Sequence, residues 1–492
     1  MTVFVLLGGN AEKASAWCDR IGLPSGRRLP RRLAESVPLC VIRMCPGEDC
    51  SENERLPEGV SVLQRQEPVR RALDVGTVIR ALARNGIRST AGHWRSQGSG
   101  TASRQLTVPV FHLEALGVYS SGGRGGPIGR ASAAALLPWE EEDAGSRSVL
   151  LRRVKREAVR AVYALGLDYG LVTLVSDGSG HPAVVGVEPC PSMTGLIGEA
   201  FADGIRRFAE EWTASAASTS QSELLFGMDP EFVLRRPGPN GRIVSADKFL
   251  ERRGVVGCDS VRIGDRMLYP LAELRPPPAA EPETLFRHLA AAMRLAAERI
   301  HDASLEWLAG GMPVRGLALG GHIHVSGVWL NAELLRAMDN YMTLPLVMIE
   351  DSTTRLRRPA YGALGDFRRQ WHGGFEYRTL PSWIVSPTLA MGVLALARIV
   401  CEHYRELRRR PLASEEMQIW YYEGNKDRIE SAVTELWSDL ERTAAYARYA
   451  PYLVKLKKRI VERRSWNEQQ DLRKLWKIVP SMRTAIGPSS KS

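Results

Sequence analysis

The sequence predicts an α+β protein in which a smaller α/β region precedes a larger region of strands and helices in the C-terminal half. Three observations predict this arrangement. The chain has 492 residues, too many for one ordinary hydrophobic core, so two or three domains are expected. Residues 211–222 (EWTASAASTSQS) are small, polar and poor in hydrophobic side chains, which is typical of a domain boundary. Beyond them, strand-like segments are accompanied by helical patterns at 282–309 and 331–348 and by a helix-rich stretch at 387–478.

The composition predicts a globular chain, since 44% of the residues are hydrophobic and 25% are charged. The formal net charge is +11, which by itself would suit a nucleic-acid-binding protein. The positive residues are nevertheless spread along the chain and mixed with acids, so nucleic acid is not an expected partner. The densest run falls in a helical pattern near the C-terminus and is expected to form a solvated helix face: Lys455, Lys457, Lys458, Arg459, Arg463 and Arg464.

The cysteines and the apolar segments bear on the compartment. Seven cysteines are too few for a disulfide framework, and the evenly spaced Cys40, Cys45 and Cys50 lack the paired spacing of a zinc site. We expect free thiols in a reducing compartment. The apolar N-terminus lacks the basic region of a signal peptide, and the apolar stretch 389–401 is interrupted by Arg398 and too short to cross a bilayer. A cytoplasmic protein without a membrane partner is expected.

The first half has the pattern of a small α/β region after residues 1–60, to which the sequence assigns no role. The glycine-rich segment 120–129 (SSGGRGGPIG) lacks the Lys-Ser/Thr ending of a phosphate-binding P-loop, so a plain flexible loop is expected. The predicted elements are helices at 69–85 and 154–165 and strands at 106–111, 169–174 and 183–187.

Polar residues two positions apart recur in four short segments of the second half. In a β-strand such residues point to the same face. If the four strands adjoin, one sheet face gathers carboxylates, imidazoles and guanidiniums, and the carboxylates would repel one another without cations. Hard oxygen ligands with an imidazole suit Mg²⁺ or Mn²⁺. The pairs are Asp229 with Glu231, Glu273 with Arg275, His322 with His324, and Glu376 with Arg378.

Each pair also has an ordinary structural explanation. Asp229 and Glu231 flank Pro230, which cannot donate to a strand ladder, so they would suit an exposed strand edge. A His-x-His sequence is often a surface pair, and Glu-x-Arg on a strand is usually a structural ion pair. Four such pairs within one domain, each flanked by apolar residues, favour a functional site.

The order of these motifs resembles the carboxylate–amine ligases (amidoligases) of the glutamine synthetase and glutamate–cysteine ligase superfamily. It is most similar to the phage-type COOH–NH₂ ligase branch, which opens with Gly-x-Asp-Pro-Glu-Phe, here residues 227–232. The resemblance implies a glutamine synthetase-like antiparallel sheet with helices over 223–478, after a linker at 206–222 and before a frayed tail at 479–492. It also implies ATP and Mg²⁺ (or Mn²⁺), small-molecule or peptide carboxylate and amine substrates, and an amide or peptide bond formed through an acyl phosphate.

The resemblance further implies roles for single residues. Nucleotide contacts are expected from His324 and Ser326, and from Arg358 and Arg368 in the stretch RRPAYGALGDFR. Arg378 is expected beside the transferred phosphoryl group, with Arg368 as a second catalytic arginine. No acid in 276–280 matches a further metal ligand of glutamine synthetase, which implies a weaker second site or one completed by substrate. The implied metal ligands are Asp229, Glu231, Glu273, His322 and Glu376.

A weaker resemblance concerns the first half. Residues 164–170 (ALGLDYG) and the following Val187-Glu188-Pro189-Cys190-Pro191 are similar to the closing segment of ATP-grasp ligases, whose usual pattern is Glu-x-Asn-Pro-x-Pro. Gly186 occupies the Glu position and Glu188 the Asn position, so one metal ligand is missing. The resemblance implies a reduced ATP-grasp-like domain over 61–205.

Two other functions fit parts of the pattern. A guanidino-kinase-like phosphotransferase would share the sheet architecture, and a phosphorylated acceptor without an amide product would favour it. A non-catalytic basic binding or scaffold protein would show salt-sensitive DNA binding without ATP turnover. The intact acid, histidine and arginine pairs argue against the scaffold.

Overall fold

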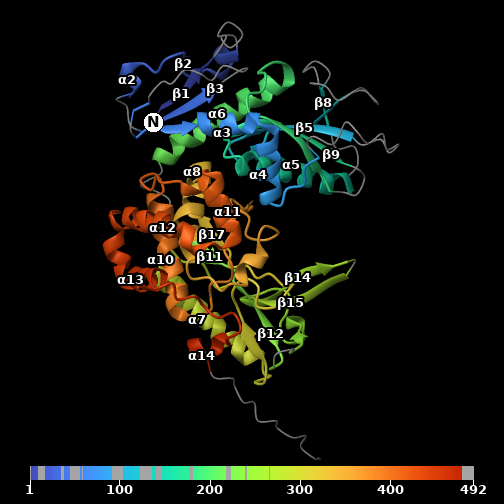
Figure 1. The fold of residues 1–492 in the computed structure, drawn as a ribbon, viewed down its shortest axis with the longest axis vertical. Helices are drawn as coiled ribbons and strands as arrows, with labels where there is room; N and C mark the ends of the chain where they lie inside the picture. The colour runs from blue at the N-terminus through green and yellow to red at the C-terminus, as the bar shows by residue number, and fades with distance from the viewer. Residues whose placement is uncertain are drawn as a thin grey trace, which may run out of the picture. The chain divides into compact units, whose positions relative to one another are not determined.

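The chain combines helices and sheets throughout, as the sequence predicts (Figure 1). It divides into two compact units, Met1–Gln221 and Ser222–Ser492, which are described separately. The computed structural model describes residues 2–8, 17–34, 38–44, 56–57, 59–90, 104–121, 136–139, 146–176, 181–217, 223–238, 241–264 and 266–478.

The first unit begins with a parallel sheet in the order β2-β1-β3-β4. Its core holds Phe4, Leu6, Val41 and Val60. Strand β4 lies beyond residue 60, so this sheet crosses the boundary expected between 1–60 and 61–205. Cys40 is buried within β3, whereas Cys45 and Cys50 lie outside the described residues. The elements are β1 (Thr2–Leu7), β2 (Ser25–Gly26), α2 (Arg31–Ala34), β3 (Leu39–Met44) and β4 (Ser61–Leu63).

An antiparallel sheet in the order β10-β9-β5-β7-β8, with β6 paired to β5, forms the rest of the first unit. The helix expected at 69–85 is two helices, because the side chain of Asp74 caps the second one by accepting from the backbone N–H of Thr77 at 2.7 Å. The glycine-rich segment beyond Ser121 lies outside the described residues. The elements are α3 (Gln66–Leu73), α4 (Val75–Arg84), β5 (Arg104–Phe111), β6 (Glu114–Ala115), β7 (Tyr119–Ser121), β8 (Leu136–Pro138), α5 (Ser146–Ala164), β9 (Tyr169–Ser176) and β10 (Ala183–Glu188).

The acid of the ALGLDYG segment is held by the backbone. Asp168, just before β9, is buried and accepts from the backbone N–H of Gln64 at 2.6 Å. The Gln64 side chain in turn accepts from the N–H of Asp168 at 2.9 Å and donates to the carbonyl O of Pro189 at 2.8 Å. Asp168 therefore fastens the end of β4 to β9.

Helix α6 (Gly195–Ala217) occupies most of the linker expected at 206–222. Phe201, Ile205, Phe208 and Trp212 are buried and spaced by four, three and four residues, which places them on one helix face. That apolar stripe outweighs the polar composition of the segment, so the helix continues to Ala217, where the described residues stop until Glu223.

The second unit contains two antiparallel sheets rather than the single sheet that the sequence suggested. One has the order β11-β17-β19-β18, and the other β13-β12-β15-β14 with β16 paired to β12. The chain passes from the first to the second at Asp229 and Pro230, between β11 and β12. Pro230 has no N–H to donate, so a ladder can end there. The strands are β11 (Leu225–Met228), β12 (Glu231–Arg235), β13 (Ile243–Val244), β14 (Val256–Ile263), β15 (Arg266–Leu274), β16 (Glu306–Leu308), β17 (Ile323–Ser326), β18 (Phe367–Arg369) and β19 (Phe375–Tyr377).

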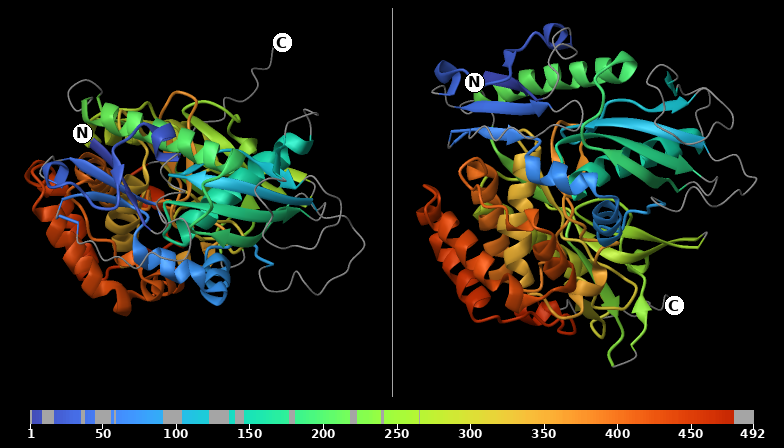
Figure 2. Two further views of the ribbon diagram at one scale, coloured as in Figure 1. Left: turned by 90° about the horizontal axis from the view of Figure 1, so that it is seen from above. Right: turned by 45° about the horizontal axis from the view of Figure 1, so that its top comes forward.

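Helices of the second unit gather on one side of its strands (orange to red, Figure 2). Helix α10 packs against α7, α8 and α13, and its apolar stretch from Leu389 to Cys401 is buried among them. Within the described ranges, no helix is apolar and long enough to span a bilayer. The helices are α7 (Pro282–Arg299), α8 (Ala332–Met338), the π-helix η4 (Asp339–Thr343), α9 (Leu344–Val347), α10 (Pro387–His403), α11 (Glu415–Glu423), α12 (Lys426–Glu441), α13 (Tyr446–Val461) and α14 (Leu472–Trp476), with 3₁₀ turns η3 (Ala246–Lys248), η5 (Thr354–Arg357) and η6 (Pro411–Ala413).

Several cations of the basic run near the C-terminus pair with acids. Lys457 contacts Glu441 at 2.5 Å, and Arg463 contacts Glu430 at 2.5 Å. Arg464 contacts Glu462 at 2.6 Å. These cations lie on and after α13 beside acids of the neighbouring helical segments, as expected of a solvated helix face. The tail 479–492 lies outside the described residues.

Candidate active site

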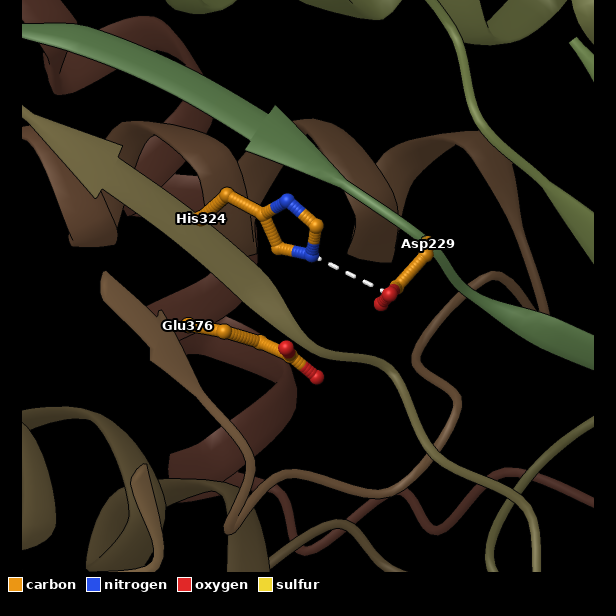
Figure 3. A group of neighbouring side chains, drawn as sticks. All are labelled: Asp229, His324 and Glu376. Carbon is orange, nitrogen blue, oxygen red and sulfur yellow. Dashed lines mark ion pairs between the residues drawn. The ribbon is translucent and has the colours of Figure 1, made fainter. Parts of the chain in front are cut away.

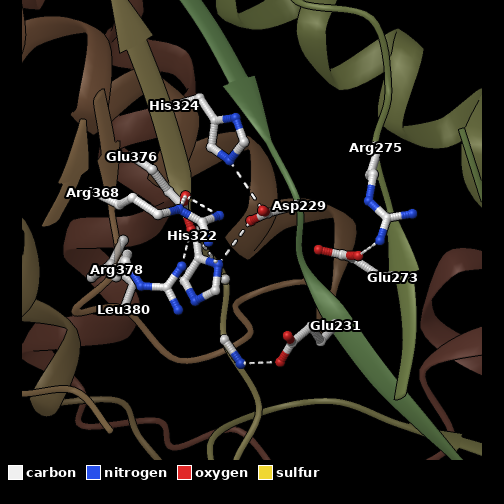
Figure 4. Close-up of polar contacts among 12 residues, drawn as sticks. Asp229, Glu231, Glu273, Arg275, His322, His324, Arg368, Glu376, Arg378 and Leu380 are labelled. Atoms are coloured by element: carbon white, nitrogen blue, oxygen red, sulfur yellow. Dashed lines mark hydrogen bonds and ion pairs between the residues drawn. The ribbon is translucent and has the colours of Figure 1, made fainter. Parts of the chain in front are cut away.

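A cavity of about 690 Å³ opens between the two sheets of the second unit. Acids, histidines and arginines from both sheets line it, and Figure 4 shows how their side chains converge. A smaller hollow of about 300 Å³ beside α7 holds none of the predicted site residues. Predicted site residues that line the larger cavity are Asp229, Glu273, His322, His324, Ser326, Arg368 and Arg378.

The first acidic group forms around Asp229, which follows β11. Its Oδ2 lies 3.1 Å from His324 Nε2, and its Oδ1 lies 3.0 Å from His322 Nδ1. His322 Nδ1 is also 3.2 Å from Glu376 Oε1. Asp229, His324 and Glu376 each offer a ligand atom within 4.8 Å of the others (Figure 3). Both His322 and His324 therefore lie where a cation at the first acidic group would bind, whereas the sequence suggested His322 alone as a metal ligand.

Strand register explains why these side chains meet. His324 on β17 is directly opposite Glu376 on β19, and Glu376 is directly opposite Arg368 on β18. Directly opposed residues of antiparallel strands share one face, so the three side chains form a row across the sheet. Gly227 on β11 completes the row opposite His324 and leaves that end of it without a side chain. The open end belongs to the cavity.

Gly320 makes room for the imidazole of His322. A Cβ at Gly320 would lie 2.3 Å from His322 Nε2, so any other residue there would require the imidazole to move. The backbone N–H of Gly320 donates to Glu231 Oε2 at 2.6 Å. One glycine therefore both admits a histidine of the first group and orients a carboxylate of the second.

The second acidic group lies on the other sheet. Glu231 on β12 is directly opposite Glu273 on β15, and Asp259 on the neighbouring β14 brings a third carboxylate. One oxygen from each lies within 4.8 Å of the others. The sequence had not singled out Asp259. The sequence showed no further acid in 276–280 after Glu273, whereas Asp259 comes from the preceding strand of the same hairpin.

Two arginines contact Glu376, which is fully buried. Arg368 Nε donates to Glu376 Oε2 at 2.7 Å, and Arg378 donates to Glu376 Oε1. The Arg368 side chain is 60% exposed, so its guanidinium can turn toward a ligand in the cavity. Arg275 similarly contacts Glu273. Both Glu-x-Arg sequences thus form ion pairs, which the structural explanation and the functional one both expect.

Arg358 does not line the cavity. Its guanidinium contacts Glu350, donates to the carbonyl O of Tyr421 at 2.6 Å and lies 4.5 Å above the Tyr421 ring. The side chain is 2% exposed. Arg358 is buried and paired with Glu350. It therefore lies away from the cavity that His324, Ser326 and Arg368, the other residues expected to contact the nucleotide, help to line.

The pKa shifts differ between the two acidic groups of the site. Burial raises the pKa of Glu231 to about 7. Burial also acts to raise the pKa of Asp229, but the contacts with His322 and His324 outweigh it and hold that pKa well below its usual range. For His322, burial favours the neutral form, yet the Asp229 carboxylate prevails and raises the pKa. Without a cation, Glu231 therefore holds a proton below about pH 7, and a metal would displace that proton.

Both groups fit divalent cations. Among the described residues, Asp229 Oδ1, His322 Nδ1 and His324 Nε2 are buried atoms that make no hydrogen bond of good geometry, although they face one another. Buried polar atoms without such partners are rare unless a ligand or ion satisfies them. The second group offers carboxylate oxygens alone, which Mg²⁺ and Mn²⁺ prefer.

Stability of the metal-free protein should fall as the pH rises from 5 to 8. The pKa of Glu231 is about 7 in the folded state against 4.5 for the free group, so the folded protein binds more protons than the unfolded chain in this interval. Stability must then decrease by up to about 3 kcal/mol. His322, whose pKa is raised, contributes in the same direction above its ordinary value of 6.5.

Urea unfolding in a chelator at pH 5, 6, 7 and 8 measures this effect, with Glu231→Gln as the matched variant. Glutamine keeps an oxygen acceptor for Gly320 but cannot ionise, so most of the decrease should disappear and only the His322 part should remain. Parallel stability curves for the two proteins would refute the assignment.

Comparisons with known proteins bear on the second unit. A family model described as "Phage phiEco32-like COOH.NH2 ligase-type 2" matches residues 226–478. The comparison with curated proteins found no match.

Similar solved structures resemble the chain only loosely. D-alanine–D-alanine ligase from Bacillus anthracis, complexed with ATP, has 10% identity and a TM-score of 0.27, covering 41% of this chain and 91% of that one. A bifunctional glutathione synthetase from Pasteurella multocida has 12% identity and a TM-score of 0.34, covering 55% and 53%. The ATP-grasp ligase PsnB, complexed with a minimal precursor, has 10% identity and a TM-score of 0.28, covering 43% and 99%. Likeness at this level supports no conclusion about fold or activity.

The family match takes in both acidic groups, every predicted site residue and all the residues that line the cavity except Leu225, and it spans just over half of the 492 residues. The chain therefore belongs to the phage phiEco32-like, type 2 family of COOH–NH₂ ligases.

Proposed function

We propose that the second unit joins a carboxylate to an amine at the expense of ATP, with divalent cations held by the two acidic groups. The observation that carries the proposal is that Asp229, Asp259 and Glu273 line one cavity together with the two histidines of the first group and three arginines, while the buried Glu231 and Glu376 complete the two acidic groups. Because the chain belongs to a COOH–NH₂ ligase family, we assign this cluster of charged side chains to the ligation reaction.

The reaction needs ATP because a carboxylate does not react with an amine directly. In the proposed first step, a substrate carboxylate oxygen forms a bond to the γ-phosphorus of ATP, and the bond to ADP breaks. In the second, the amine nitrogen attacks the acyl carbon, phosphate leaves with its bonding electrons, and the amine loses a proton. Both steps require reactants that are aligned and shielded from water.

The acids would hold two cations. Asp229, Glu376 and a histidine would bind one, and Glu231, Glu273 and Asp259 the other. Bound Mg²⁺ or Mn²⁺ would neutralise phosphate oxygens and stabilise the charge that moves during phosphoryl transfer. The buried carboxylates fix where that positive charge stands, since burial limits their side-chain motion.

Arg378 and Arg368 would act on the transferred phosphoryl group. Arg378 is oriented by Glu376 and lies 3.8 Å from Asp366, so its guanidinium is held between two acids. Arg368 is more exposed and is suited to close on a bound phosphate. Glu376 would thus orient both arginines while binding a cation.

His324 and Ser326 would approach the nucleotide from β17, and a glutamine synthetase-like arrangement of the sheets would fit these roles. We extend the proposal to the first unit, in which Asp168 is held by Gln64, as a reduced ATP-grasp-like domain.

Substrate-dependent ADP formation tests the proposal. The full-length protein, Mg²⁺ and ATP are combined with amino acids and peptides as carboxylate and amine, and ADP is measured together with product mass. We expect ADP only when both substrates are present, with a product whose mass equals their sum less one water. ADP formed with a phosphorylated acceptor and no amide would instead indicate a phosphotransferase.

A further inference from the structure

Arg275 is the third arginine that lines the cavity, and the proposed reaction steps make no use of it. It directly follows β15, whereas Arg368 and Arg378 lie on or directly after strands of the other sheet. In Figure 4, Asp229 lies between Arg275 on one side and Arg368 and Arg378 on the other. Arg275 therefore offers a positive charge on the far side of the acids from the two arginines assigned to the phosphoryl group.

The guanidinium of Arg275 is held at the cavity from two sides. It contacts the Glu273 carboxylate, and its Nη1 donates to the carbonyl O of Arg252 at 3.3 Å. Strand register places Gly257 directly opposite Glu273, and a Cβ at Gly257 would lie 2.3 Å from Arg275 Nη1. Any other residue at this position would require the guanidinium to move. The glycine thus leaves the space that the guanidinium occupies.

Arg275 keeps hydrogen-bonding capacity for a ligand. A guanidinium has several N–H donors in one plane, and two parallel donors match the two oxygens of a carboxylate. Within the described ranges, the guanidinium donates to Glu273 and to Arg252 O alone. The side chain is 33% exposed and lines the cavity. Arg275 can therefore bind an anion in the cavity while it still contacts Glu273.

The chain after Arg275 bears on which anion fits. Residues 276–278 are three prolines, of which Pro276 and Pro278 line the cavity. Phosphate sites commonly use several backbone N–H groups, and proline has none. The guanidinium therefore has apolar rings beside it rather than further donors. That combination suits a carboxylate attached to methylene groups better than a phosphate.

We propose that Arg275 binds a substrate carboxylate other than the one that ATP activates. The inference rests on the proposed function and specifies its substrates: one of the two carries a second, unreacted carboxylate, as amino acids and dicarboxylic acids do. With the nucleotide beside His324 and Ser326 on β17, its phosphates would meet Arg368, and Arg275 would hold the substrate from the opposite side. Binding at Arg275 would thus align the reacting group of the same molecule with the acidic groups.

Four small probes test the inference by titration calorimetry with the full-length protein in Mg²⁺ and ADP. Glycine differs from glycinamide in having a carboxylate beside its amine, and glutarate differs from butyrate in having a second carboxylate. We expect a preference of about tenfold for the probe with the additional carboxylate in at least one pair, because a guanidinium–carboxylate contact is charge-assisted. The pair that shows the preference identifies the substrate that Arg275 recognises.

Arg275→Gln should abolish that preference. Its affinity for the preferred probe should fall about tenfold, whereas its affinity for the counterpart that lacks the carboxylate should stay unchanged. Arg275→Lys keeps the charge without the planar pair of donors and should recover part of the preference. Arg262→Gln removes an exposed cation of β14, whose Nε donates to Gly264 O at 3.2 Å, and should alter none of the affinities.

Other results would overturn the inference. Absence of a preference in both pairs, or of binding by all four probes, would mean that Arg275 forms no carboxylate site. A preference that persists in Arg275→Gln would place the carboxylate elsewhere, and equal weakening of both members of a pair would mean that Arg275 acts only through Glu273. Weaker binding of inorganic tripolyphosphate by Arg275→Gln would assign the arginine to the nucleotide. Failure of the proposed function would show separately, as a lack of ADP formation with every pair of amino acids and peptides.

Discussion

Glu376→Ala is expected to lower the rate of ADP release by about a hundred- to a thousandfold, the size of effect seen when one group that stabilises transition-state charge is removed. Glu376 is fully buried and contacts Arg368, Arg378 and His322. Its loss would remove a cation ligand and release both arginines from their orientation. A coupled assay of ADP formation with saturating substrates measures the effect.

Two further variants separate chemistry from folding. Glu376→Gln keeps the size of the side chain and an oxygen acceptor but removes the charge, so it should lose nearly as much activity with a smaller effect on stability. Glu402→Ala removes a partly exposed acid that pairs with Arg398 on α10 and should leave turnover within twofold. ADP release near the wild-type rate in Glu376→Gln would count decisively against a cation at the first acidic group.

Short-range patterns in the sequence predicted most of the residues at the site. The alternation of polar and apolar residues in a strand is local, so His322 and His324, or Glu376 and Arg378, could be recognised without knowing which strands pair. Ile323 lies between the two histidines and Tyr377 between Glu376 and Arg378. Both are buried in the core on one side of the sheet, so the polar residues of each pair share the opposite side. The family membership of residues 226–478 followed from the same motifs.

Long-range pairing was beyond those patterns. The sequence suggested one sheet, whereas the chain changes sheets at Pro230, and no local feature states which strand lies beside β11 or β12. The burial of Arg358 depends on Glu350, eight residues before it, and on Tyr421, 63 residues after it, neither of which belongs to the motif that contains the arginine. Helix α6 was missed because its polar residues were weighed without the buried stripe that includes Phe208 and Trp212.

Asp259 had a signal that could have been used. The dipeptide Gly264-Asp265 between two strand-like segments is a common hairpin turn. Folding β14 back on β15 around it brings Asp259 onto the strand beside Glu273. A register shift between Asp259 and Val261 then sets Asp259 opposite Leu271 and Gly257 opposite Glu273, so the turn predicts the neighbouring strand but not the face on which the third carboxylate lies.

Asp259→Asn is expected to lower turnover about a hundredfold at limiting Mg²⁺ and to recover part of the loss at high Mg²⁺, since loss of one ligand weakens a cation site rather than abolishing it. Asp259, Glu231 and Glu273 offer oxygens within 4.8 Å of one another. Measuring ADP release against Mg²⁺ concentration gives the shift, and calorimetry with Mn²⁺ gives the affinity directly.

Asparagine is the informative replacement because Asp259 also has a structural contact. Its Oδ1 accepts from the backbone N–H of Ser260 at 2.7 Å, and the amide oxygen of asparagine can accept the same bond. A purely structural Asp259 would therefore tolerate Asn and fail as Ala, whereas a cation ligand would fail in both with a shifted Mg²⁺ dependence. Asp427→Asn, at an acid of α12 that is 82% exposed, supplies the matched loss of charge and should not alter that dependence. An unshifted Mg²⁺ curve in Asp259→Asn would leave Glu231 and Glu273 as a two-carboxylate site completed by substrate.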